Sequence, residues 1–186
     1  MQNLDPERVL PLVLSIAAGV LTSATAWGQA TATATQSIQG EIDPAGKLSV
    51  PATLTLTSAG GPTFPSFTGS ATVSYRARTT PTGSGAITAQ VTSNFSPTGG
   101  PSASAGDLTY TCSGSTLGTN CSGTQTASTA SATPVLTIPS SACTGGGGSC
   151  SASDPNTMQV NFTLTNQVTY KTGTFSAQVT FSISAT

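Results

Sequence analysis

The C-terminal stretch of the chain alternates apolar and polar residues without interruption. From Phe175 onward every second side chain is apolar, in the order Phe175, Ala177, Val179, Phe181, Ile183 and Ala185. A β-strand points successive side chains to opposite faces, so a period of two places all of these on one face. The run predicts a strand with one buried face and one solvated face.

The composition favours an all-β chain and excludes several classes of function. Only 6% of the residues are charged, histidine is absent, and the chain contains 20 glycines. Few strong helix formers remain, while threonine and serine suit the exposed face of a sheet. The net charge of −1 and the scattered basic residues give no cluster for a phosphate backbone. We therefore predict no nucleic-acid partner.

Further alternating runs, separated by Gly, Pro and Ser, follow one another along the chain. We expect strands around residues 48–56, 69–78, 87–91, 108–112, 135–138, 158–170 and 175–185. Pro51 marks the first as an edge or bulged strand, and Asn166 and Gln167 mark a bend in the run 158–170. About eight strands at this spacing, without helical periodicity, predict an immunoglobulin-like β-sandwich.

A second, weaker run lies near the other terminus. Residues 31–42 alternate, and one face carries small or aliphatic residues: Ala32, Ala34, Ile38, Gly40 and Ile42. A strong strand at one end and a weak, detachable strand at the other are typical of a subunit that lends its N-terminal strand to a neighbour. The pattern predicts a structural polymer subunit, with residues 31–42 as a donor strand and 43–186 as the β-sandwich domain.

The first 30 residues have the pattern of an export signal. An apolar stretch from Val9 to Val20 precedes small residues, so we expect a signal peptide over 1–30, cleaved after Ala26 or Ala30. The alternative is that the apolar run is retained as a helix in a filament core or membrane. A cleaved signal peptide indicates that the mature protein is secreted.

The four cysteines agree with export. Cys112, Cys121, Cys143 and Cys150 form an even set in Gly/Ser/Thr-rich segments, which favours disulfides over a zinc site. We favour Cys112–Cys121 and Cys143–Cys150, because each pair closes a short loop between strands. The crossed pairings remain open.

Catalytic groups are scarce. Without histidine there is no ordinary Ser-His or Cys-His pair and no imidazole ligand. After the signal segment the carboxylates are Glu41, Asp43, Asp107 and Asp154, and none of their spacings indicates a calcium loop or a catalytic pair. We predict that the chain is no enzyme and binds no cofactor, metal or small-molecule substrate.

The two ends of the chain resemble pilins that assemble by donor-strand exchange in the chaperone–usher manner, including relatives of the alpha-fimbrial and spore-coat U type. Gly173 stands fourteen residues from the end, and Val179, Phe181 and Ile183 occupy the alternating apolar positions after it. The segment from Glu41 to Pro44, after the donor run, is similar to the start of the first pilin strand.

The resemblance implies a groove that receives the donor strand. Its residues would be Gly173, Phe175, Val179, Phe181 and Ile183, partnered by Ile38 and Ile42 of a neighbour. It also implies a head-to-tail homopolymer, a periplasmic chaperone and an outer-membrane usher as partners, and a cell-surface filament with a role in adhesion.

Another class of protein fits the same sequence. A monomeric secreted β-sandwich would bind a glycan or a surface through loops at residues 97–106 or 143–150, because binding residues concentrate on loops. The oligomeric state of the exported protein separates this alternative from a polymer subunit.

Overall fold

The chain folds into two antiparallel β-sheets. The computed structural model describes residues 35–61, 63–140, 142 and 155–186, and the chain divides after Gly40, so that the sheets belong to the unit 41–186. In chain order the elements are β1 (Ala45–Ser49), β2 (Thr57–Ser58), β3 (Phe67–Arg78), β4 (Gly85–Ser96), the 3₁₀ turn η1 (Ala103–Ala105), β5 (Leu108–Ser113), β6 (Thr119–Asn120), β7 (Gln125–Thr126), β8 (Thr133–Ile138), β9 (Asn156–Leu164) and β10 (Ser176–Ala185).

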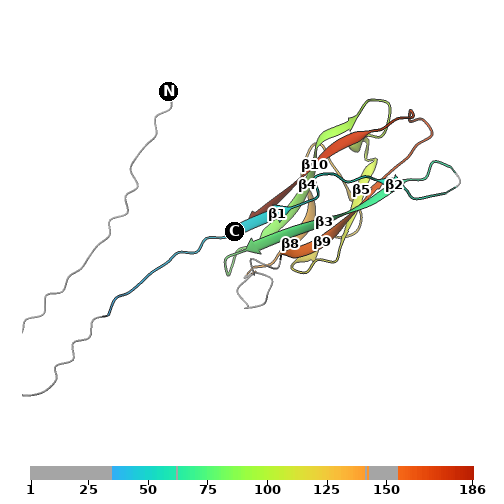
Figure 1. Ribbon diagram of the computed structural model, residues 1–186. Helices are drawn as coiled ribbons and strands as arrows, with labels where there is room; N and C mark the ends of the chain where they lie inside the picture. Colours follow the sequence, from blue (N-terminus) through green and yellow to red (C-terminus); the bar gives the residue numbers. More distant parts are fainter. Residues whose placement is uncertain (1–34, 62, 141, 143–154) are drawn as a thin grey trace, which may run out of the picture. The chain divides into compact units, whose positions relative to one another are not determined.

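One sheet has the order β1-β3-β9-β5-β7, with β2 also pairing β3, and the other has the order β10-β4-β8-β6. Apart from β2 and β3, the paired strands are not consecutive in the chain, as in the pairing of β3 with β9 from Phe67↔Leu164 to Tyr75↔Asn156. Figure 1 shows that β1 begins, and β3 and β10 end, at the same end of the sheets.

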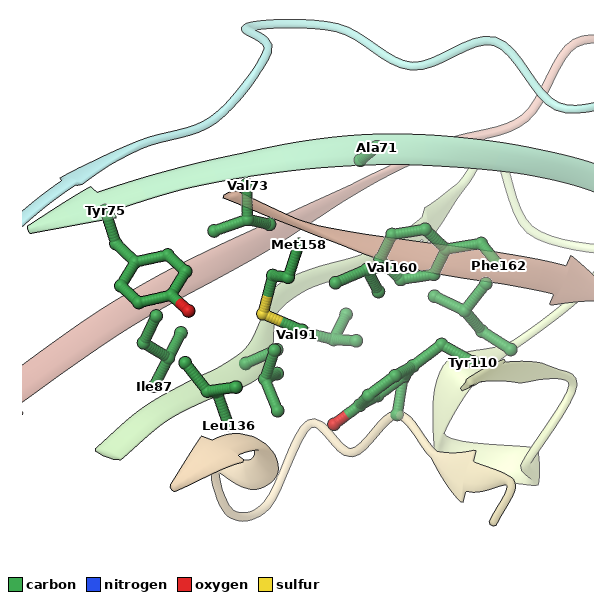
Figure 2. Packing of buried hydrophobic residues seen from close by; sticks show 14 of the residues in the cluster. Ala71, Val73, Tyr75, Ile87, Val91, Tyr110, Leu136, Met158, Val160 and Phe162 are labelled. Carbon is green, nitrogen blue, oxygen red and sulfur yellow. The ribbon is translucent and has the colours of Figure 1, made fainter. Parts of the chain in front are cut away.

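The two sheets share one apolar core. The inward side chains of β3 and β9 face those of β4 and β8, and Figure 2 shows Met158 and Val160 between Val73 on one side and Val91 on the other. Strict alternation along β9 produces this, because every second residue of Asn156–Leu164 is buried. The largest fully buried side chains are Tyr75, Tyr110, Ile87, Ile138, Met158, Val73, Val91, Val135 and Val160.

Two buried tyrosines of the first sheet hydrogen-bond backbone groups outside that sheet, Tyr110 on β8 and Tyr75 on the loop before β6. The Tyr110 hydroxyl donates to the Pro134 carbonyl oxygen at 2.9 Å and lies 2.7 Å from Thr133 Oγ1. The Tyr75 hydroxyl donates to the Leu117 carbonyl oxygen and accepts from the Leu117 amide at 3.3 Å. Because a buried hydroxyl without a partner is destabilising, these bonds allow two polar groups inside the core. Burial raises the pKa of both tyrosines.

The disulfide Cys112–Cys121 confirms one predicted pairing. Cys112 lies in β5 of the first sheet, and Cys121 directly follows β6, the edge strand of the second sheet. The disulfide therefore links the two sheets near β6. Cys143 and Cys150 lie outside the described residues, as do Ala32, Ala34 and the predicted signal peptide.

The prediction of a strand over residues 48–56 was wrong about where the strand ends. β1 ends at Ser49, and residues 50–56 run without strand pairing until β2 begins at Thr57. Pro51 has no amide hydrogen and a fixed φ, which interrupts the ladder to β3. The expectation of an edge strand was confirmed, because β1 pairs only with β3.

The expected run over residues 158–170 also ends early. β9 stops at Leu164, and Val168 is 70% exposed in the loop that follows. The Thr165 amide donates to the Asp107 carbonyl oxygen at 2.8 Å, and the Tyr170 amide donates to the Gln167 carbonyl oxygen at 3.0 Å. These bonds form a turn where alternation alone predicts a strand.

We predict that the double change Cys112→Ala with Cys121→Ala lowers the free energy of unfolding by about 2–3 kcal/mol, because the bond closes a short loop in the unfolded chain. Urea denaturation of the oxidised protein measures the change. The variant lacks both cysteines, so a reductant should not lower its stability further by breaking this disulfide. An unchanged urea midpoint in the variant would contradict the prediction.

Candidate functional site

The edge of β10 is the main candidate for a functional surface. β10 pairs with β4 from Ala185↔Gly85 to Ser176↔Ser96, with two register shifts near Gln178, and it ends its sheet. Within the residues that the structure describes, no strand pairs with its other edge. An edge strand presents backbone amide and carbonyl groups that are free to pair with a further strand.

The apolar side of β10 is only partly covered. Val179, Phe181 and Ile183 pack against the core, yet every inward residue of the strand stays half-buried. By contrast, the inward residues of β9 are fully buried. A strand that alternates as strictly as β10 would normally bury its apolar face, so part of its cover is absent from the isolated unit.

β1 covers only one end of this face. A Cβ placed on Gly46 would lie 3.2 Å from the Ile183 side chain, so the β1 backbone approaches β10 closely there. Further along, Val50 and Leu54 of the unpaired segment 50–56 remain 38% and 39% exposed. The sequence analysis did not single out Gly46, although a glycine inside a strand often marks a close approach of this kind.

The opposite end of β10 is fixed by the loop before it. The Lys171 amide donates to the Gly99 carbonyl oxygen at 2.8 Å, and the Phe175 ring lies directly over Gly100. A Cβ on Gly100 would come within 2.3 Å of that ring. The strand therefore enters the sheet at a position set by the loop over residues 97–101.

A buried carboxylate organises the same loop. Asp107 Oδ2 accepts from the Ser102 amide at 2.7 Å, and Oδ1 accepts from Gln167 Nε2 at 3.2 Å. Tyr170 hydrogen-bonds the same side chain. Desolvation, then the hydrogen bond to Asp107 and the negative charge of Asp107, raise the pKa of Tyr170 to about 12. Asp107 thus has a structural role that its sequence context did not indicate.

The predicted site residues fall into two groups. Val179, Phe181 and Ile183 lie on the half-covered β10 face, whereas Phe175 precedes the strand and packs on Gly100, and Gly173 is exposed in the loop.

Of the predicted donor residues, Ile38 is 89% exposed and Ile42 is 74% exposed, and residues 35–42 form no helix or strand. Gly40 lies in the same stretch. An exposed isoleucine is unfavourable in water, so these side chains are available for burial against a partner.

Charged side chains lie toward the two ends of the unit. In the described part of the unit the acidic and basic residues are Glu41, Asp43, Lys47, Arg76, Arg78, Asp107 and Lys171. Among the described residues no three His, Cys, Asp or Glu side chains gather as a metal site would require. An open hollow formed by residues 103–106 and 126–130 is lined by Ala, Ser, Gly and Thr alone.

In the part of the chain with described structure, no helix has the length and apolar character needed to cross a membrane. Comparison with protein-family models, with curated proteins and with solved structures finds no match to this chain.

We predict that Gly100→Ala destabilises the protein by about 1–3 kcal/mol, because the added methyl group overlaps the Phe175 ring and the start of β10 must shift. Gly40→Ala is the matched control, since a Cβ there meets no described atom within 4 Å. Thermal or urea unfolding compares the two variants, and equal stabilities would show that the loop does not fix β10.

We predict that Tyr170 weakens the folded state at high pH. Its folded pKa of about 12 lies above the ordinary value of 10.0, so its stabilising effect is complete below pH 10 and is lost as the pH rises toward 12. Unfolding midpoints between pH 9 and 12 should fall less steeply for Tyr170→Phe than for the wild type. Parallel slopes for the two proteins would contradict the assignment.

Proposed function

We propose that this chain is a structural subunit of an extracellular filament of the pilus type, in which residues 31–42 of one subunit pair with the β10 edge of the next. The unpaired edge and half-covered apolar face of β10 are the observation that carries the proposal. On this proposal the two sheets form an immunoglobulin-like sandwich completed by the neighbour's strand.

The donor run and the edge have matching lengths. β10 has 10 residues, and the proposed donor run of residues 31–42 is slightly longer. At roughly 3.3 Å per residue, either strand spans about 33 Å or a little more, so the run can follow β10 along its whole length.

Their chemistry also matches. The donor run contributes a small apolar face that includes Ile38 and Ile42, and β10 contributes the bulkier residues Val179, Phe181 and Ile183. Burial of an exposed isoleucine contributes about 1.5–3 kcal/mol, in addition to the hydrogen bonds of the added strand.

Such a contact does not close on itself. One surface of the subunit gives a strand and a different surface receives it, so successive contacts are head-to-tail and generate a filament. A long unpaired apolar edge is an aggregation hazard before assembly, which is why a periplasmic chaperone and an outer-membrane usher belong to the same proposal. Export by a signal peptide over residues 1–30 and a place on the cell surface follow from it as well.

We predict that Ile38→Asp and Ile42→Asp each abolish filaments, because a carboxylate cannot enter an apolar interface without a partner. The sandwich unit should remain folded, since both side chains are exposed in the isolated subunit. Negative-stain electron microscopy and size-exclusion chromatography of the exported protein measure assembly, and circular dichroism measures folding.

Gln39→Asp is the matched control, because it adds the same charge to the opposite face of the donor run. On β10 the corresponding pair is Val179→Asp, expected to block assembly, and the exposed Thr180→Asp, expected to permit it. Filaments from the Ile38 and Ile42 variants would overturn the proposal. A wild-type protein that stays monomeric would favour the secreted binding module instead.

A further inference from the structure

The segment that leads into β1 is tied to the end of β3. Arg78 is the last residue of β3 and pairs with Ala45, the first residue of β1. Its guanidinium group donates from Nε to the Asp43 carbonyl oxygen at 2.8 Å and donates to the same oxygen from Nη2. Two bonds from a planar, permanently charged group fix the orientation of that peptide.

Local stereochemistry restrains the same peptide. Pro44 follows Asp43, and a residue before proline is pushed toward an extended conformation, while proline itself has a fixed φ. Asp43 lies two residues before the first β1–β3 pair, so the restraints act just beyond the ladder. We call Arg78, Asp43 and Pro44 the exit clamp.

The position of the exit clamp bears on whether a subunit can fill its own edge. β1 begins at the end of the sheets where β10 finishes, because the Thr80 amide donates to the Thr186 carbonyl oxygen at 3.0 Å and Gly46 lies against Ile183. To lie along its own β10, the segment before β1 would have to reverse direction within residues 41–44. It would then run parallel to β10, in the less stable pairing.

We propose that the exit clamp is a positioning device that keeps the donor segment out of its own subunit's edge and leaves that segment for a second copy of the chain. The inference rests on the proposed function, since it explains why the donated strand would pair with a second copy of the chain and not with its own β10. Arg78 acts through the Asp43 carbonyl group and does not itself belong to the β10 edge. Loss of the clamp frees residues 41–44 to turn, and self-insertion then competes with assembly.

Arg78→Ala and Arg78→Lys test this inference in the full exported chain. Both lose the two-bond contact, and lysine retains the charge. We expect each to raise the ratio of monomer to filament at least about tenfold at a fixed protein concentration, as follows from losing a charge-assisted contact. Arg76→Ala is the charge control, because it removes one positive charge from the same strand and keeps the two bonds from Arg78 to Asp43.

Hydrogen exchange on the monomer fraction supplies the second measurement. In the Arg78 variants the amides of residues 31–42 and those β10 amides that point away from β4 should become protected together, to an extent independent of protein concentration. In the wild-type monomer the same amides should exchange rapidly, while the β10 amides bonded to β4 stay protected in every variant. Equal exchange and equal monomer ratios in the wild type and both Arg78 variants would overturn the inference.

The two proposals fail in different ways. A wild-type protein without filaments overturns the proposed function, and exchange in its monomer still decides whether the clamp blocks self-insertion. Protection of residues 31–42 in the wild-type monomer overturns the clamp even where filaments form.

Discussion

The incomplete cover of β10 is the constraint on which the rest of this structure depends. A strand with strict alternation can be stable at a sheet edge only while something shields its apolar side, and here the opposite sheet shields it at one end through the contact of Gly46 with Ile183. The loop at the other end, with Phe175 on Gly100, fixes the start of the strand. The edge between these two contacts is therefore ordered in the isolated unit, and this order would lower the entropy lost if a further strand paired with it.

The scarcity of charge is consistent with this arrangement. The outer faces of the sheets carry Thr, Ser, Asn and Gln, which bond to one another, as in Ser70 Oγ to Asn161 Oδ1 at 2.6 Å and Gln159 Nε2 to Thr72 Oγ1 at 2.8 Å. Such faces stay hydrated without ions, and neighbouring subunits approaching along them would desolvate few charges. The charged groups lie instead near the ends, where Asp107 hydrogen-bonds the Ser102 amide of a loop and Arg78 hydrogen-bonds the Asp43 carbonyl group of the exit segment.

The sequence predicted the fold where alternation and burial coincide and failed where other interactions decide the structure. The long strands β3, β9 and β10 were predictable, since each alternates over many residues. β4 was predicted only over residues 87–91 of Gly85–Ser96, because its alternation ends after Val91. The two-residue strands β6 and β7 were not, because pairs such as Tyr110↔Gln125 depend on long-range packing that leaves no local period. Loop 165–175 was misread because Val168 and Tyr170 keep the period of β9 while hydrogen bonds to Asp107 and Gln167 impose a turn.

Only the apolar residues of β10 in the candidate site could be predicted from the sequence. Val179, Phe181 and Ile183 follow from period two, but nothing local reveals that β10 ends its sheet, because strand order is set by non-local pairing.

The same reasoning explains why the proposed donor run is weak as a strand. In the proposed interface β10 would supply the bulkier side chains, so a complementary strand would need small residues such as Gly40 beside large ones such as Ile38 and Ile42. A donor run with its own strong apolar face would pair with itself or aggregate before reaching a partner. On the proposed function, a weak run that the exit clamp keeps from its own edge would gain its stability only on a second copy of the chain.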